Sequence, residues 1–247
     1  MAAGCARLRM RMKSRQINYL HNRGCPSQMN FLRHFHQALV VLFALLNGMM
    51  LYLFLLNLPY GLDLFLATFR KWQALSPQAG YAMGFTVVLM GMAVFTLRRL
   101  DDQWKNRLLF FRWSEPHPAR DAFLSTRRQP FGSAELLSAF PKVKDAGFDP
   151  GIQVESWERA HQRHAANPVV LNTEIHWRML RDLYVLGLLF LIVFLLGWLA
   201  KAGIPFQLVA TYVFLFGAQV LFLLLAARRL GFRLVDNVLG VELGLGE

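Results

Sequence analysis

Four long apolar runs alternate with polar segments along the 247-residue chain. Each run has about 17 to 22 residues, which as an α-helix matches the roughly 30 Å hydrocarbon core of a bilayer. None of them contains Asp, Glu, Lys, Arg or His. Because lipid cannot hydrogen-bond the backbone, such segments cross it as helices. The pattern predicts an all-α integral membrane protein with four spans, which cover residues 38–58, 79–97, 183–199 and 206–227.

The spacing of the runs predicts two transmembrane helical hairpins with a longer polar segment between them. The third and fourth runs are joined by a short connection containing the helix breakers Gly203 and Pro205, so they form a tight pair. The chain then has five parts: an N-terminal tail (1–37), a first hairpin (38–97), a central helical and proline-rich segment (98–182), a second hairpin (183–227) and a C-terminal tail (228–247).

Lysine and arginine give the expected direction of the spans. Of the 27 basic residues, only Arg70, Lys71 and Lys201 lie in the hairpin loops. Short segments rich in these residues stay in the cytoplasm, so both tails and the central segment are expected there, at a bacterial inner membrane. The first 16 residues, rich in arginine and without acids, also fit a transit peptide, so the mitochondrial inner membrane is the alternative. Met29 is an alternative start.

The overall charge bears on the expected partners. The net charge is +12, and basic residues beside spans contact the anionic lipids of the cytoplasmic leaflet. Nucleic acid is not expected, because the central segment balances fourteen basic residues with eleven acidic ones and forms no basic stripe. The two cysteines, Cys5 and Cys25, lack histidines at zinc spacing, so no metal or other cofactor is expected.

The second span is expected to continue as an amphipathic helix beyond Arg99. Apolar residues recur at spacings of three and four up to Phe111, with Trp104 among them. A helix of this length would project by about 20 Å or lie in the headgroup layer. Trp104 is a candidate lipid or partner contact in either case.

Prolines interrupt the next stretch of the central segment. Pro116 and Pro118 exclude a long helix there. We expect a loop of roughly forty residues, a length that is typical of functional or partner-bound loops. One or two helical turns at 119–125 and a short helix at 134–140, capped by Ser133, are expected within it.

The stretch Trp157–Pro168, WERAHQRHAANP, is part of a helix expected from 154 to 164. A metal site is one hypothesis for it, since Glu158, His161 and His164 follow one another at intervals of three. The first and last members lie about 120° apart on a helix, so all three do not easily meet one ion. His176 from the following helix is a further candidate ligand.

Two other hypotheses exist for the same stretch. Arg159 and His164 have the Arg-x4-His spacing of small helical ribonucleases, in which they would handle a phosphate and a proton. The third hypothesis is an ordinary amphipathic helix that ends at Asn167-Pro168, with basic residues complementing its dipole. We expect the third arrangement.

Several other polar or small residues are candidates for contacts. At the mouth of the third span, Arg178, Arg181 and Asp182 are interpreted as partner or lipid headgroup contacts, or alternatively as an anchor with a local Arg–Asp pair. Within the spans, buried amides bridge helices, and glycines four apart permit close helix contact and homo-oligomers. The residues of this second kind are Asn47, Gln219, Gly80 and Gly84.

The order of these features resembles a loose class of small bacterial inner-membrane proteins, some encoded beside anti-phage defence systems. The resemblance rests on a Pro-x-Pro-x-Arg-x-Ala-Phe element after the second span, an Arg-Asp pair entering the third, and the ending RLVDNVLGVEL. The matching residues are Pro116, Pro118, Arg120, Ala122, Phe123, Arg181 and Asp182. The resemblance implies a membrane effector or accessory subunit and carries no catalytic residues.

The uncharged spans exclude several classes of function. Proton relays, ion-coupled carriers and voltage sensors use ionisable residues inside the membrane. We therefore expect a non-enzymatic multi-pass subunit that binds partner proteins through its central segment and whose oligomers would form a pore. A structural subunit of a larger inner-membrane complex and a membrane-anchored Arg-x4-His ribonuclease remain as alternatives.

Overall fold

The computed structural model describes residues 26–58, 72–124, 130–200 and 203–245. Each of four long helices contains all or most of one predicted apolar run, and each is long and apolar enough to cross a membrane. The predicted all-α fold with four spans in two pairs is confirmed. The four helices are α2 (Pro26–Leu55), α4 (Trp72–Arg99), α9 (Pro168–Ala200) and α10 (Phe206–Glu242).

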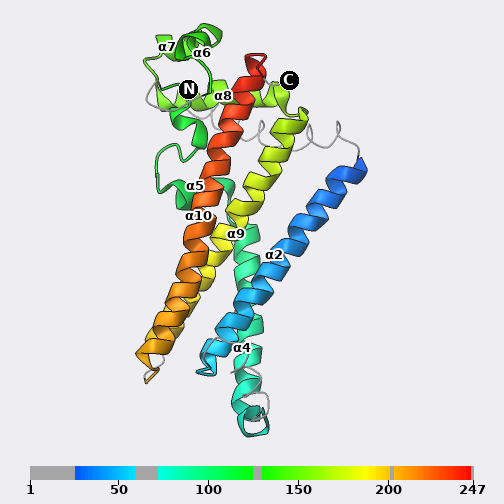
Figure 1. Ribbon diagram of the computed structural model, residues 1–247, viewed down its shortest axis with the longest axis vertical. Helices are drawn as coiled ribbons and strands as arrows, with labels where there is room; N and C mark the ends of the chain where they lie inside the picture. Colours follow the sequence, from blue (N-terminus) through cyan, green and yellow to red (C-terminus); the bar gives the residue numbers. More distant parts are fainter. Residues whose placement is uncertain (1–25, 59–71, 125–129, 201–202, 246–247) are drawn as a thin grey trace, which may run out of the picture.

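The long helices pack as two pairs around an aromatic core. Figure 1 shows α9 and α10 side by side along most of their length, while α2 packs against α4 and α9. Phe54 of α2 meets Phe194 of α9, with ring centroids 4.6 Å apart, and Tyr212 of α10, at 5.4 Å. The Tyr212 hydroxyl donates to the Leu58 carbonyl at 2.9 Å. The two pairs therefore share one core.

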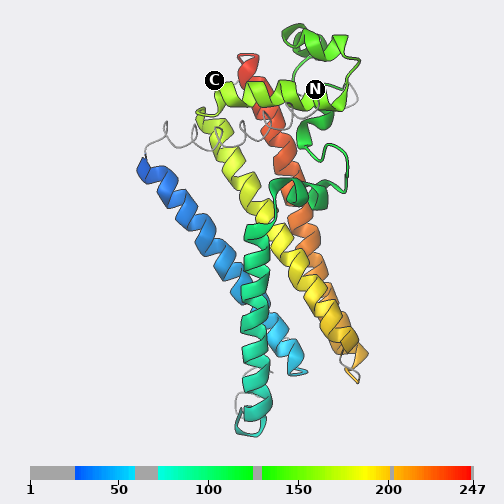
Figure 2. The same ribbon diagram turned by 180° about the vertical axis from the view of Figure 1, so that it is seen from behind.

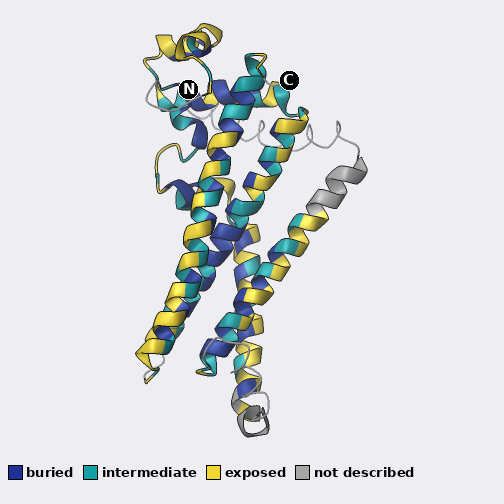
Figure 3. Cartoon of the chain, viewed as in Figure 1, coloured by how far each residue is buried: buried dark blue, intermediate teal, exposed yellow. Residues whose placement is uncertain are grey.

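The outward faces of the long helices are apolar over the predicted spans. Exposed residues along α4 and α10 include Phe85, Met92, Phe214 and Phe222, and Figure 3 shows these helices exposed along their outer sides. A soluble protein seldom exposes apolar surface so continuously, whereas lipid covers such a surface without penalty. The exposure agrees with a membrane-integrated bundle.

A second core lies beyond the spans. The ends of α9 and α10 continue past their apolar runs and carry four shorter helices, as Figures 1 and 2 show. We call the head the unit formed by these helices with residues 168–180 and 230–242. Its core includes Phe123, Trp157 and Leu234, all buried. The shorter helices are η1 (Pro118–Asp121), α6 (Ser133–Ala139), α7 (Pro141–Asp145) and α8 (Pro150–His164).

The expected continuation of the second span to Phe111 is wrong. The chain breaks at Asp101, whose backbone is extended, with φ −66° and ψ 150°, and whose carboxylate accepts from the Asp102 backbone N–H at 3.0 Å. A separate helix, α5 (Asp102–Phe110), follows and packs against α9 and α10. Aspartate is a favoured N-cap because it satisfies a free amide at the helix start, so a new helix begins where the old one ends.

The expected forty-residue loop is partly wrong, because it also contains α7 and the first turn of α8. The helical turn at η1 and the short helix α6 were expected, but Gly132 rather than Ser133 is the N-cap of α6. The helix α8 begins at Pro150, earlier than expected, because the Asp149 carboxylate accepts from two backbone amides of its first turn. At the C-terminus, α10 continues to Glu242 through residues expected to form a tail.

Candidate functional site

The stretch Trp157–Pro168 forms the C-terminal half of α8 and the turn that follows it. Trp157 is 4% exposed, and its ring packs against His117, with centroids 4.8 Å apart, and is stacked on His161 at 5.0 Å. On the opposite face Arg159 forms an exposed ion pair with Glu155. The helix is thus amphipathic, with its aromatic side buried in the head.

Two histidine–carboxylate contacts connect α8 to the long helices α9 and α10. His161 Nε2 lies 3.2 Å from Glu174 Oε2 on α9, and Glu174 also pairs with Arg178. His164 Nε2 lies 2.8 Å from Glu242 Oε2 at the end of α10. Each histidine is therefore held by a carboxylate from a different long helix.

The metal and nuclease hypotheses find no support in these positions. Glu158 is exposed, and His176 bonds the Asn172 carbonyl of its own helix at 2.7 Å. Within the described residues, no three His, Cys, Asp or Glu side chains are placed to hold a metal ion. Arg159 pairs with Glu155, whereas His164 pairs with Glu242.

The environment of α8 shifts the pKa of two groups. Burial is the largest cause that lowers the pKa of His117 to about 3, and the charges of His161 and Arg181 contribute to the same shift. The neutral His117 Nδ1 accepts from the Ala119 backbone N–H at 3.1 Å, which makes it the N-cap of η1. Partial desolvation raises the pKa of Glu158 even though the residue is exposed. The charge of His161 opposes this shift, and Glu115 and Glu155 add to it.

A second polar network lies where the apolar runs end. Arg181, with a side chain only 5% exposed, donates to Asn106 Oδ1 at 3.0 Å and to Asp102 Oδ1 at 2.6 Å. Lys105 Nζ donates to Asp182 Oδ1 at 3.0 Å. Arg181 and Asp182 thus bind α5 to α9, and neither is placed as an outward contact. Sequence reasoning missed Lys105 and Asn106.

His36 of α2 joins this boundary network. Its Nε2 lies 3.5 Å from Asp182 Oδ2, which connects α2 to the same point on α9. Arg178, one turn before Arg181 on α9, has a half-exposed side chain and pairs with Glu174 in the head. Charged side chains at the start of the third span therefore connect α2, α5 and α9.

The Pro-x-Pro element is a structural part of the head. Pro118 and Phe123 are buried, and the Phe123 ring packs on Phe140 with centroids 5.0 Å apart. The Phe123 backbone N–H donates to buried Gln153 Oε1 at 3.1 Å. Pro116 and Arg120 are half-buried at its edge, and Arg120 Nη1 donates to the Ser114 carbonyl at 3.4 Å.

Among the described residues, the predicted packing residues show no hydrogen bond to another helix. Asn47 Nδ2 donates to the Phe43 carbonyl of its own helix at 2.9 Å, and Gln219 is half-buried on α10. Gly80 and Gly84 lie on an exposed face with open space around them. Close approach occurs instead at Gly231, where an added Cβ would lie 2.9 Å from Trp177 Nε1.

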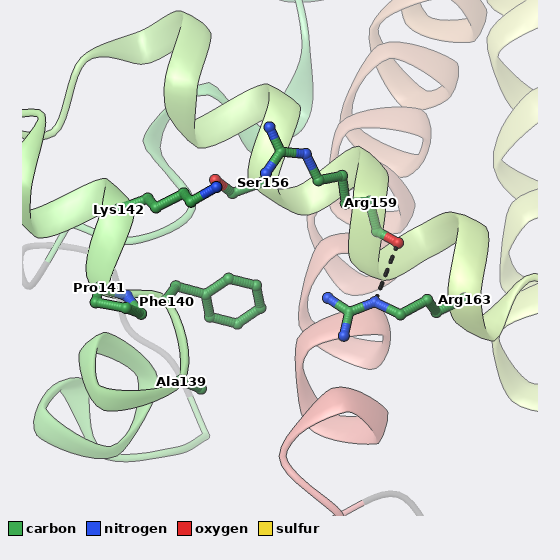
Figure 4. A pocket seen from close by; sticks show the side chains of 7 residues that line it. All are labelled: Ala139, Phe140, Pro141, Lys142, Ser156, Arg159 and Arg163. Atoms are coloured by element: carbon green, nitrogen blue, oxygen red, sulfur yellow. Dashed lines mark hydrogen bonds between the residues drawn. The ribbon is translucent and has the colours of Figure 1, made fainter.

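One cavity of about 180 Å³ opens on the head between α7 and α8. Figure 4 shows that its cationic side chains come from both helices and surround an apolar wall that includes the Phe140 ring. Glu242 holds Arg163 at 2.6 Å. An apolar wall with cations around it can receive a group that is both acidic and partly apolar. The lining residues are Ala139, Phe140, Pro141, Lys142, Ser156, Arg159 and Arg163.

The four apolar helices and the head define a multi-pass membrane protein with a folded extramembrane unit. Comparison with family models, curated proteins and solved structures finds no match.

Proposed function

We propose that the protein is a non-enzymatic membrane subunit that binds a partner protein through its head. The observation that carries this proposal is the second packed core, which unites α8, η1 and the ends of α9 and α10. A segment that merely connected two hairpins would not need a buried Trp157 or Phe123. A rigid unit fixed to two spans instead presents a defined surface to a partner.

The cavity between α7 and α8 is the proposed docking point on that surface. Lys142, Arg159 and Arg163 surround it, and Phe140 gives it an apolar wall. Glu155 and Glu242 hold the two arginines in place, which lowers the entropy lost on binding. The complementary ligand is an acidic segment of a partner protein that also carries an apolar side chain.

The proposed location is a bacterial inner membrane with the head and both termini in the cytoplasm, and a mitochondrial inner membrane is the alternative. The distribution of basic residues supports this orientation. A role as accessory or effector subunit follows from the resemblance to proteins encoded beside defence systems. Exposed Gly80 and Gly84 are compatible with a homo-oligomer. A fluorescent reporter fused after Glu247 tests the orientation, because it matures only in the cytoplasm.

Photo-crosslinking in native membranes tests the docking site. A crosslinker at Ser138, beside the cavity, should capture one partner, and K142E should abolish the capture because it places a negative charge at the cavity. The matched control is K144E, which makes the same charge change on α7 at a residue that does not line the cavity. Equal capture by the two variants would contradict the proposed docking point.

A further inference from the structure

The helix α5 buries two polar side chains and exposes aromatic ones. The face buried against α9 and α10 contains Lys105 and Asn106 beside the apolar Leu109 and Phe110, whereas Trp104 and the C-cap residue Phe111 are exposed. A helix on the surface of a soluble protein buries its aromatic residues and exposes its charges. The outer face of α5 is therefore suited to a medium other than bulk water.

Three exposed aromatic side chains gather on this face. Trp104, Phe111 and Trp113 are 46%, 65% and 76% exposed, and the two tryptophan rings meet edge to face with centroids 6.1 Å apart. Phe111 adopts a left-handed backbone with φ 52°, which is uncommon for a bulky residue and projects the ring from the end of the helix. Tryptophan and tyrosine concentrate at the headgroup level of bilayers, where aromatic rings are partly solvated.

Two guanidinium groups lie among these rings. Arg107 Cζ is 4.8 Å from the centroid of Trp104, and Arg228 Cζ of α10 is 4.9 Å from that of Phe111. Arg228 Nε donates to the Leu109 carbonyl at 2.7 Å, which leaves its terminal nitrogens free to bind elsewhere. In the described part of the chain neither arginine forms an ion pair, and Arg107 Nε is buried without a hydrogen-bond partner.

The position of α5 along the long helices places this face at the membrane surface. Arg228 directly follows the apolar run 206–227, and α5 is bound to Arg181 and Asp182, which directly precede the run 183–199. Figures 1 and 2 show α5 beside α9 and α10 between their apolar halves and the head. The two free cations therefore lie at the level of lipid phosphates.

We propose that the outer face of α5 binds an anionic phospholipid, whose phosphate contacts the guanidinium groups of Arg107 and Arg228. Arginine binds phosphate oxygens through two parallel N–H donors. Nearby carboxylates do not neutralise the site, because Asp102 pairs with Arg181 and Asp121 with Arg112. Two positive charges without a carboxylate favour a lipid with net negative charge over a zwitterionic one.

Native mass spectrometry of the full chain in detergent with equimolar phosphatidylglycerol and phosphatidylcholine tests this inference. The wild-type protein should retain phosphatidylglycerol preferentially. R107Q should lower that preference about fivefold, the effect of one charge near an anionic surface. K144Q removes one positive charge on α7 in the head, at a residue that does not line the cavity, and should leave the preference unchanged. Circular dichroism should show equal helix content in all three proteins.

Two results would overturn the proposal. One is equal retention of the two lipids by the wild-type protein. The other is an equal effect of R107Q and K144Q, which would mean that overall charge, not the α5 face, selects the lipid. A third arm adds millimolar inorganic phosphate, which should not displace the lipid, since the aromatic rings contact its glycerol and acyl parts. Displacement by phosphate alone would identify a free-anion site instead. None of these outcomes depends on partner binding by the head.

Discussion

The short helices α5 and α8 both contact α9 and α10, yet they differ in the side chains that they bury and expose. In α8 the aromatic Trp157 is buried while Arg159 is exposed. In α5 the charged Lys105 is buried against Asp182, beside the apolar Leu109 and Phe110, while Trp104 is exposed. The difference follows from their positions along the same two long helices. The exposed aromatic residues of α5 fit the proposed position of this helix in the headgroup layer, whereas the exposed Arg159 of α8 suits water.

The largest expected effect comes from truncating the inward aromatic side chain of α8. W157A should destabilise the head by about 3–5 kcal/mol, as for other buried tryptophans, because it also removes the stacking partner of His117 and His161. Denaturant unfolding in detergent, followed by near-UV circular dichroism, measures this change. W104A on the outer face of α5 is the control and should change stability by less than about 0.5 kcal/mol. Equal losses would remove the contrast between the two helices.

The inward polar face of α5 provides the next test. R181A leaves the buried Asn106 amide without its donor and should cost about 2 kcal/mol. The cost stays below that of a fully buried ion pair because its other partner, Asp102, is largely exposed. The same unfolding measurement applies. R178A, which removes an exposed arginine one turn away, should cost much less, and a larger loss in that control would contradict the assigned network.

A smaller loss of stability is expected from adding a side chain at Gly231, where Trp177 and Phe110 lie close to the backbone of α10. G231A places a methyl group against the Trp177 indole and Phe110, so the α9–α10 contact must open slightly, at a cost of about 1–2 kcal/mol. G240A lies on the same helix with open space around it and should be neutral or slightly stabilising, since alanine favours the helix. Thermal midpoints of the two variants in one detergent give the comparison.

The smallest expected effect is a dependence of head stability on pH. His117 has a pKa of about 3 when folded and near 6.5 when unfolded, so only the unfolded state takes up a proton as the pH falls. Stability is therefore complete above pH 6.5 and declines below it, by about 1 kcal/mol between pH 7 and 5.5. H117N keeps an acceptor for the Ala119 amide but cannot titrate, so its unfolding free energy should fall less over that interval. Parallel curves for both proteins would contradict the assignment.

The spans could be predicted from the sequence because each is a local property of composition. A charge-free run of sufficient length is stable in lipid as an α-helix, and each of the four runs forms one. The break before α5 could not be predicted in the same way, since the apolar spacing up to Phe111 fits a continuous helix equally well. The break depends on contacts of Lys105 and Asn106 with α9, more than seventy residues away in the sequence.

The candidate site was predictable to a lesser degree. The exposure of Trp104 and the helix that contains His161 and His164 agree with the sequence pattern, because both follow from helical periodicity. The burial of Arg181 and Phe123 does not, because charges at the mouth of a span ordinarily face headgroups and prolines ordinarily mark loops. The head core draws its residues from short elements at irregular spacing, which leave no periodic signal.

The uninterrupted length of α10 has a mechanical consequence. Its 37 residues extend about 55 Å, against a hydrocarbon core of roughly 30 Å, so one rigid rod begins in lipid and ends inside the head. Spans adapt to bilayer thickness by tilting. Since α10 has no break at the membrane surface, each change in tilt swings the whole head through the same angle. A change in bilayer thickness would therefore change both the height of the head above the membrane and its orientation.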